Sequence, residues 1–245
     1  MFAADLDLSK VPPSEHGARK AVSVAGSFGD WDYLTTGGQG CVGAGPAPAG
    51  GGPAGGGEPG VRCANMTRAE YRTAFSTWVV GASPLIIDAD IRNLSAFQRE
   101  TLLHDEVLAL HHDELAKGGS RIGCMDTKLV QQQPPQQRCV TQVWAKPLDG
   151  NQTLIALLNL GNNPQTLRLP FNLLGYGSGS EDSHRSQHDI SSSVAATAPQ
   201  WLSLRDVWAR KELGRFTGSF TTAPVQAHET LLLRVRTAAA PPQYV

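Results

Sequence analysis

The chain has 245 residues, with 21 basic and 22 acidic side chains and a formal net charge of −1. This balance argues against a nucleic-acid partner, because nucleic-acid-binding domains gather a basic excess on one surface. No apolar run approaches the roughly 18 residues that a membrane-spanning helix needs, so neither a transmembrane helix nor a membrane partner is expected.

The beginning of the chain does not resemble a secretory leader. Met1–Leu8 has neither the basic start nor the long apolar stretch of a signal peptide. Three N-x-[ST] sequons nevertheless begin at Asn65, Asn93 and Asn151, and such sequons are glycosylated only in the secretory pathway. Chance is the alternative explanation, because short motifs of this kind arise at random in a chain of this size.

Four cysteines indicate the same compartment. Cys41 and Cys63 flank one predicted loop, and Cys124 and Cys139 flank another. Each pair is expected to form a disulfide, which requires an oxidising compartment; four free thiols are the alternative. The spacing excludes a C-x-x-C metal or redox motif. Secretory features without a signal peptide predict that this sequence lacks its N-terminal part.

The first 120 residues are expected to contain capped helices and a flexible insertion. Residues 42–60 are almost entirely Gly, Ala and Pro, a composition that buries nothing. Thr67–Glu70 is a capping box that starts one helix, and Ser95–Gln98 starts a second. The first helix ends at Gly81. Its apolar face follows the spacing i, i+3, i+4, i+7 and consists of Tyr71, Ala74, Phe75 and Trp78.

Two short hydrophobic runs are expected to be buried parallel strands. Leu85–Ile87 and Val107–Leu110 are continuous apolar runs, typical of strands that are covered on both faces. With the two helices they give the order helix, strand, helix, strand. This order indicates an α/β domain.

From about Arg121 the pattern changes to an all-β module. Short strands at this spacing, without a helix between them, predict an antiparallel β-sandwich. Residues 175–199 are rich in Ser, Gly and His and are expected to form a mobile loop. The expected strands are Val140–Leu148, Thr153–Leu160, Gln165–Leu169, Leu202–Trp208, Arg215–Thr221 and Thr230–Arg236.

Several residues that could bind a ligand have simpler explanations. His104, His111, His112 and Asp113 could suggest a metal site, but adjacent residues on a strand point to opposite faces, so no metal is expected there. Asp88 and Asp90 are expected to cap the following turn and to pair with Arg92.

Three tryptophans of the β segments alternate with polar residues. They are expected to belong to the core of the sandwich and not to form sugar platforms. They are Trp144, Trp201 and Trp208.

A series of motifs follows in a fixed order along the chain: Asp30–Leu34 with Gly37 and Gly38, Met66–Trp78, Pro84–Ser95, Glu106–Asp113, Gln142–Leu148 and Ile155–Asn159. Together they resemble the α-galactosidases (melibiases) of glycoside hydrolase family 27, over roughly Gly26 to Thr237. The linked order makes this resemblance specific, which no single motif would. Two departures stand out. His111-His112-Asp113 stands where Asn-Gln-Asp is more usual, and Asp30-Trp31-Asp32 where many members have Asp-Pro-Asp.

The resemblance implies a mixed fold, α/β plus all-β. Residues 1–120 would be the last part of a (β/α)8 TIM barrel, with Glu106–Asp113 as its last strand, and residues 121–245 an antiparallel β-sandwich domain. A complete barrel needs about 250 residues, so over half of the barrel is expected to be absent. A partial barrel would leave strand edges unpaired and an apolar face open.

The resemblance also implies where the sugar would bind. Asp32 and Tyr33 match the pair that lies by the galactose pocket at a strand end, although the position of Tyr33 is often Met in the family. Asp5 is a candidate for the acid/base carboxylate, with Met1 where an Arg is expected. No residue of this chain matches the nucleophilic Asp, so this chain alone is expected to be inactive.

The implied activity is hydrolysis of terminal α-linked galactose with retention, without a metal or organic cofactor. The alternatives are a non-catalytic carbohydrate-binding remnant and an α-N-acetylgalactosaminidase. The expected partner is a galactose-terminated saccharide, and the resemblance allows a homodimer. The complete protein would be secreted, vacuolar or lysosomal.

Overall fold

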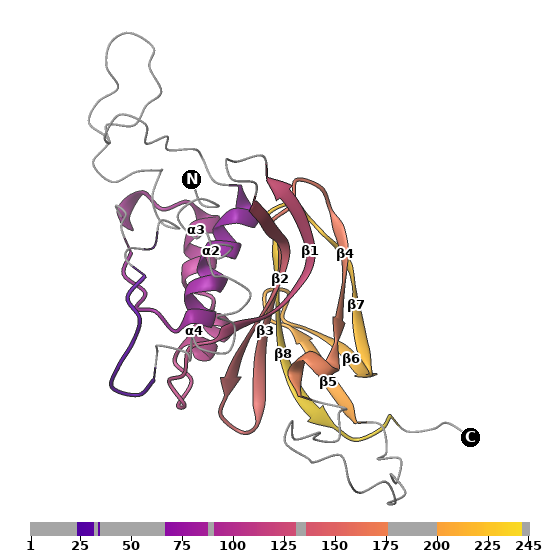
Figure 1. Ribbon diagram of the computed structural model, residues 1–245. Helices are drawn as coiled ribbons and strands as arrows, with labels where there is room; N and C mark the ends of the chain where they lie inside the picture. Colours follow the sequence, from indigo (N-terminus) through magenta and orange to yellow (C-terminus); the bar gives the residue numbers. More distant parts are fainter. Residues whose placement is uncertain are drawn as a thin grey trace, which may run out of the picture.

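A computed structural model describes residues 24–31, 34, 67–87, 91–130, 136–175 and 200–241 of the chain. Figure 1 shows three layers: a group of helices, a large antiparallel sheet and a small second sheet on the far side of the large one. Within the described residues, no helix is both long and apolar enough to span a membrane.

The helical layer contains α2 (Arg68–Gly81), α3 (Ala96–Leu102), α4 (Asp105–His111) and the 3-10 turn η4 (Ile91–Asn93). Both predicted capping boxes are confirmed. The Thr67 hydroxyl accepts the Glu70 N–H at 3.2 Å while the Glu70 carboxylate accepts the Thr67 N–H at 2.7 Å. Ser95 and Gln98 make the same reciprocal pair at 3.2 and 2.8 Å. These bonds satisfy amides that a helix N-terminus otherwise leaves free.

The large sheet has six strands in the order β1-β2-β3-β8-β5-β6, all antiparallel. The second sheet pairs β4 with β7, and the 3-10 turn η5 (Phe171–Leu174) follows β4. The strands are β1 (Ser120–Val130), β2 (Gln136–Leu148), β3 (Gln152–Asn159), β4 (Gln165–Pro170), β5 (Trp201–Asp206), β6 (Lys211–Thr217), β7 (Ser219–Val225) and β8 (Thr230–Ala238). The predicted antiparallel β module is therefore confirmed, and β1 is an additional strand.

The large sheet is buried on both faces, and β3 shows why its sequence is a continuous apolar run. Leu154, Ala156 and Leu158 belong to the core between the sheet and the helices. Ile155 and Leu157 belong to the core between the two sheets. Because side chains alternate along a strand, a strand covered on both faces needs apolar residues at every position.

The predicted strand Val107–Leu110 is wrong, because these residues form most of α4. The His104 Nδ1 atom accepts the Val107 N–H at 3.3 Å and caps the helix. Asp105 and Glu106 stand in the first turn, where carboxylates suit the helix dipole. A short apolar run fits a buried helix as well as a buried strand, so periodicity could not separate the two.

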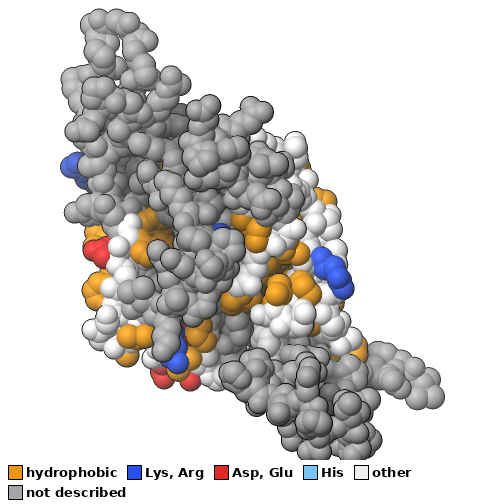
Figure 2. All heavy atoms as spheres, in the orientation of Figure 1, with side chains coloured by type: hydrophobic (Ala, Val, Ile, Leu, Met, Phe, Trp, Pro, Cys, Tyr) orange, Lys and Arg blue, Asp and Glu red, His pale blue; other side chains and the backbone are white. Residues whose placement is uncertain are grey.

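Leu85–Ile87 was predicted to be a buried strand, but two of its three side chains are exposed. Ile87 makes one isolated parallel bridge with Leu34, and the side chains of Ile86 and Ile87 are 46% and 40% exposed. Hydrophobic side chains are spread over the described part of the face shown in Figure 2. The (β/α)8 barrel itself is not shown in the described residues and stays a prediction.

Two further expectations for the β module need correction. The predicted strand Arg215–Thr221 is two strands, β6 and β7, separated at Gly218, whose φ of 72° breaks the extended chain. Trp144 and Trp208 pack in the core between the large sheet and the helices, not between the two sheets. Trp201 is half-buried on β5.

One buried ammonium group fastens the helices to the large sheet. The Lys146 side chain on β2 is fully buried, and its Nζ donates to three backbone carbonyls: Val79 of α2 at 3.2 Å, and Leu110 and His111 of α4 at 2.8 and 3.3 Å. The last carbonyls of a helix have no partner within the helix, and they carry the negative end of its dipole. Burial lowers the pKa of Lys146 to about 8, although the charge of Asp113 raises it.

An ion pair joins α4 to strand β5 of the large sheet. The Arg205 guanidinium on β5 donates to both oxygens of the Glu106 carboxylate. The distance from Nε to Oε1 is 2.7 Å, and the distance from Nη2 to Oε2 is 2.9 Å. Burial by itself would raise the pKa of Glu106. The hydrogen bond from Arg205 and the charges of Arg205 and Arg234 have the larger opposite effect, and the net result is a lowered pKa.

Lys146→Met should lower the free energy of unfolding by about 2–4 kcal/mol at pH 7. The substitution keeps the apolar stem but removes the ammonium donor from the buried carbonyls of Leu110 and His111 at the end of α4, whereas Val79 keeps the Ala82 N–H at 3.3 Å. Urea unfolding followed by far-ultraviolet circular dichroism measures the change. The matched control is Lys117→Met at an exposed lysine, which should change the stability by less than about 0.5 kcal/mol. Equal effects of the two substitutions would contradict the role of Lys146.

Glu106→Gln should cost about 2 kcal/mol at pH 7, and this difference from the wild type should shrink in acid. A carboxylate whose pKa is lowered by folding stabilises the protein above its unfolded pKa of about 4.3, and this contribution is lost as the pH falls through the folded value. Urea unfolding at several pH values tests this, with the exposed Glu114→Gln as control. A difference that does not change with pH would rule out the ion pair as its cause.

Candidate functional site

The predicted sugar-binding and catalytic residues Asp32, Tyr33 and Asp5 lie outside the described residues. The same is true of Cys41 and Cys63, which were expected to form a disulfide. Asn65 and the turn-capping candidates Asp88 and Asp90 also lie outside them. What the structure describes is the frame around Asp32 and Tyr33, because their neighbours Trp31 and Leu34 are both placed.

Trp31 is held by the segment that follows α2. Its backbone N–H donates to the Ser83 hydroxyl at 2.9 Å. Its indole meets the Trp78 ring edge-on, with centroids 5.7 Å apart. A Cβ atom on Gly81 would lie only 2.4 Å from the Trp31 ring, so the close approach of the indole to the last turn of α2 requires glycine.

Leu34 is fixed by the same segment. Its N–H donates to the Ile86 carbonyl at 2.7 Å, and it forms the parallel bridge with Ile87. Its side chain is fully buried in the core between helices and sheet. The segment Ser83–Ile87 therefore holds the residues on both sides of Asp32 and Tyr33.

Ser83 is itself fixed from two sides. Its N–H donates to the Trp78 carbonyl at 3.2 Å, and its carbonyl lies 2.7 Å from the His111 Nε2 atom on α4. Because a carbonyl only accepts, Nε2 carries the proton in this contact. Burial lowers the pKa of His111, and the charge of Lys146 lowers it further, whereas the hydrogen bond with the Ser83 carbonyl raises it.

Two of the remaining candidates, Asp113 and His104, have structural roles. The Asp113 carboxylate accepts the Asp149 N–H at 3.0 and 3.1 Å and the Leu115 N–H at 3.1 Å, which fixes the turn after α4. His104 caps α4, and its pKa is lowered by burial and by the charge of Arg210. Among the described residues, no three His, Cys, Asp or Glu side chains come close enough to hold a metal ion.

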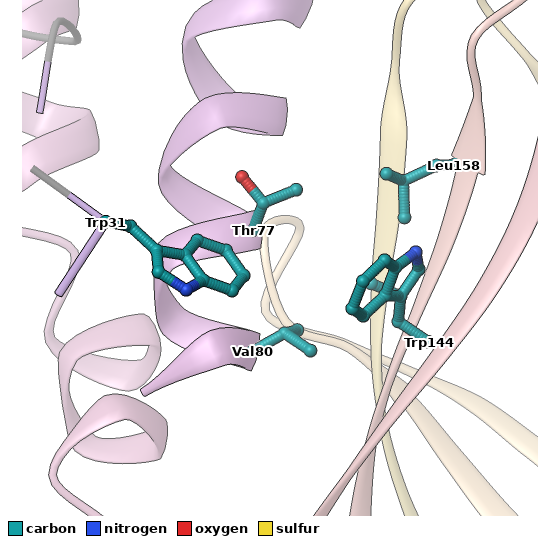
Figure 3. Close-up of a pocket in the computed structure, with 6 residues that line it drawn as sticks. Trp31, Thr77, Val80, Trp144 and Leu158 are labelled. Atoms are coloured by element: carbon teal, nitrogen blue, oxygen red, sulfur yellow. The ribbon is translucent and has the colours of Figure 1, made fainter. Parts of the chain in front are cut away.

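A small apolar hollow lies between α2 and the large sheet. Figure 3 shows Trp31 and Trp144 facing each other across it, with Val80 below and Leu158 above Trp144. Its empty volume is about 190 Å³, including space open to solvent. The Thr77 hydroxyl is already bonded to the Ala74 carbonyl at 2.7 Å, and the Trp144 indole N–H donates to the Gln142 side-chain oxygen at 2.9 Å. Sugar hydroxyls need polar partners, so this hollow is not suited to a saccharide.

The predicted disulfide Cys124–Cys139 is confirmed and joins β1 to β2, with a Cα–Cα distance of 5.8 Å. Asn151, the start of one sequon, is exposed in the turn between β2 and β3 and has a φ of 56°. Whether the sequons at Asn65, Asn93 and Asn151 carry glycans stays a prediction.

Three residues that hold this region together were not predicted from the sequence. They are Gly81 in its packing against Trp31, Ser83 and Lys146. Gly81 was assigned only to the end of the helix, and the left-handed residue at that end is Ala82, with a φ of 50°. Ser83 and Lys146 act through contacts with residues 52 and 67 positions away. No local sequence pattern indicates such partners.

Comparison with known proteins shows which proteins this chain is similar to. Residues 140–235 match the family described as the alpha galactosidase C-terminal beta sandwich domain. The resemblance to the C-terminal portion of the glycoside hydrolase family 27 α-galactosidases is thereby confirmed, together with the curated relatives and structures below.

Curated relatives match about two thirds of the chain. Alpha-galactosidase 3 of Arabidopsis thaliana is 29% identical over 164 residues, which are 67% of this chain and 31% of the relative. The alpha-galactosidase of Coffea arabica is 27% identical over 165 residues, 67% of this chain and 35% of the relative. The chain thus spans about a third of the length of these relatives.

Solved structures share the fold over most of the chain. The α-galactosidase of Saccharomyces cerevisiae with raffinose covers 88% of this chain, with a TM-score of 0.59, 18% identity and 48% of that structure aligned. A family 27 β-L-arabinopyranosidase from Geobacillus stearothermophilus covers 89%, with a TM-score of 0.60, 17% identity and 39% of that structure aligned. At these identities the likeness establishes the fold alone.

Gly81→Ala should lower the free energy of unfolding by about 1–3 kcal/mol, because the new methyl group would enter the Trp31 ring. The sign is diagnostic, since the same change at an open helix position gains up to about 1 kcal/mol. Urea unfolding followed by tryptophan fluorescence measures it. The control is Gly123→Ala on β1, where the added Cβ would meet the flexible end of Leu173 at 3.2 Å. A gain in stability for Gly81→Ala would show that Trp31 does not pack there.

Proposed function

We propose that this protein is a glycoside hydrolase that removes terminal α-linked galactose with retention. The observation that carries the proposal is the match of residues 140–235 to the C-terminal sandwich of the α-galactosidases. It is supported by the linked upstream motifs and by the curated relatives, which are named as α-galactosidases. No metal or organic cofactor takes part in the proposed reaction.

In this proposal Asp32 accepts hydrogen bonds from galactose hydroxyls, and the Tyr33 ring packs against the sugar. Retaining hydrolysis requires a nucleophilic carboxylate and an acid/base carboxylate about 5 Å apart. Asp5 is the candidate acid/base. The nucleophile has no counterpart in this chain, so the chain by itself binds galactose without turning over a galactoside.

The substrate class rests on the curated relatives, not on the fold. Structures with this fold include an α-galactosidase from Mortierella vinacea, with a TM-score of 0.56, and the β-L-arabinopyranosidase. A protein described as a putative α-N-acetylgalactosaminidase from Bacillus halodurans also shares it, with a TM-score of 0.54. N-acetylgalactosamine is therefore the competing sugar in the experiments below.

We further propose that the protein works in a secretory, vacuolar or lysosomal compartment. The disulfide between Cys124 and Cys139 supports this, because such bonds persist in oxidising compartments. Glycosylation at Asn151 would be sterically simple, since the residue is exposed at a hairpin turn.

Isothermal titration of the purified chain with galactose tests the substrate class. We expect saturable binding of galactose, weaker binding of N-acetylgalactosamine and none of glucose. Asp32→Asn should weaken galactose binding by about tenfold, because a charged acceptor is lost. The control is Asp149→Asn, an exposed acid in the turn after β2. A chain that binds neither galactose nor N-acetylgalactosamine would contradict the proposed substrate class.

Assays of hydrolysis complete the test. The chain expressed alone should release 4-nitrophenol from 4-nitrophenyl α-galactoside no faster than a blank without protein. Turnover by this chain would contradict the proposal that the nucleophile has no counterpart in it. Protein purified from its own cells should hydrolyse the galactoside. Proton NMR should then show α-galactose before β-galactose, since retention preserves the anomeric configuration. Initial release of the β anomer would exclude retention.

A further inference from the structure

One row of side chains on the large sheet lies beyond the helices that cover part of this face. Strands β8, β5 and β6 run side by side at one end of the sheet (Figure 1), and Ser203 on β5 pairs with Arg236 on β8 and with Arg215 on β6. Ser203 shares a face with Arg205, two residues further along β5, and Arg205 reaches Glu106 of α4. The side chains of Arg215 and Arg236 are nevertheless exposed and Ser203 is half-buried, so the row faces solvent.

The neighbouring row carries its own counter-charges. Arg205 and Arg234 are opposite each other in register. Glu106 lies 2.7 Å from the Arg205 guanidinium and 4.0 Å from that of Arg234, and Glu212 lies 3.4 Å from Arg205. Two arginines thus meet two carboxylates, and this row is electrically balanced.

The row with Arg215 and Arg236 has no such balance. Within the part of the chain that the structure describes, neither guanidinium forms an ion pair. The Nη1 atom of Arg215 donates to the carbonyls of Ala239 and Ala240 at 3.3 and 3.4 Å. These bonds draw the Arg215 side chain from β6 toward the end of β8, the strand that carries Arg236, but neutral carbonyls leave its charge in place. The short Ser203 side chain between two long ones leaves room where both guanidinium groups can approach one anion.

An aromatic side chain lies next to this row on the same face. Trp201 precedes Ser203 by two residues on β5, about 7 Å along the strand, and pairs with Thr217 of β6. Its indole is half-buried, and Thr217 is exposed. An indole offers an apolar surface to the C–H groups of a sugar ring, while the hydroxyls of Ser203 and Thr217 offer polar partners to sugar hydroxyls.

We propose that this face, defined by Trp201, Ser203, Arg215, Thr217 and Arg236, binds a saccharide that carries carboxylate groups. A guanidinium group pairs with a carboxylate through two parallel hydrogen bonds, and two unbalanced arginines suit one or two carboxylates. A nucleic-acid site typically neutralises on the order of 6–10 phosphates, more than this face provides for. The proposal goes beyond the proposed function and does not depend on galactose binding or hydrolysis.

Isothermal titration of the full chain with trigalacturonate, an oligosaccharide with one carboxylate on each ring, tests the proposal. We expect saturable binding, and at least about tenfold weaker binding of the trigalacturonate methyl ester, which keeps the rings and removes the charges. Arg215→Gln and Arg236→Gln should each raise the dissociation constant about tenfold. Both side chains are exposed, so both variants should keep the thermal midpoint of the wild type. The matched control is Lys211→Gln, which removes one exposed positive charge from β6 and should change the affinity by less than about twofold.

A second measurement uses the wild-type chain and needs no substitution. In the proton–nitrogen NMR spectrum of tryptophan-labelled protein, trigalacturonate should shift the Trp201 indole signal with saturation. The signal of Trp144, which packs between the large sheet and the helices, should stay in place. Neutral galactose should leave the Trp201 signal unchanged. Raising sodium chloride from about 0.05 to 0.5 M should weaken trigalacturonate binding several-fold, because salt screens exposed charges.

Four results would overturn the proposal. They are the absence of trigalacturonate binding, equal affinity for the methyl ester, an affinity that neither arginine substitution changes, and a Trp201 signal that does not move. A single-stranded DNA oligomer that binds through the same arginines as tightly as trigalacturonate would overturn the choice of a saccharide. Binding of trigalacturonate through both arginines, by a chain that does not bind galactose, would support this proposal and contradict the proposed function alone.

Discussion

The need to satisfy the carbonyl ends of two helices inside a hydrophobic core is the constraint on which this structure depends. Lys146 meets it with one ammonium group that reaches Val79 at the end of α2 and Leu110 and His111 at the end of α4. The carbonyls favour the ammonium form, while burial disfavours it and lowers the pKa to about 8. A single side chain of β2 thus contacts the C-terminal ends of both helices.

Contacts at the two ends of α2 connect it to the elements around it. At its N-terminal end, α2 is tied to the turn before β8, where the Thr73 hydroxyl donates to the His228 carbonyl at 2.8 Å and Glu70 lies 3.2 Å from the His228 ring. At the C-terminal end of α2, Ala82 is left-handed and the chain turns into Ser83. The Ser83 hydroxyl accepts the hydrogen bond from the Trp31 N–H. The order of dependence therefore runs from the sandwich to the helices, and from the helices to the backbone beside the predicted sugar site.

The predictions from sequence were correct where the signal is local and failed where tertiary contacts decide. The two capping boxes gave α2 and α3 because the reciprocal bonds lie within four residues. Strand β3 was recognisable as a short apolar run, because both of its faces pack in a core. Strand β1 was missed because Arg121, Asp126 and Lys128 give it no apolar alternation. The layer in which Trp144 and Trp208 pack, and the partners of Lys146 and Ser83, depend on which helix covers which face, so no sequence pattern contains them.

The measurement that tests the account most directly is the proton–nitrogen NMR spectrum of protein labelled at its five tryptophans, recorded during a galactose titration. Trp31 adjoins the predicted sugar-binding pair in the sequence, whereas Trp201 lies on β5 and Trp208 lies in the turn after β5, against the core between sheet and helices. We expect the amide and indole signals of Trp31 to shift with saturation while those of Trp201 stay in place. Signals that do not move at all, or that move only at Trp201 and Trp208, would contradict a galactose site beside Trp31.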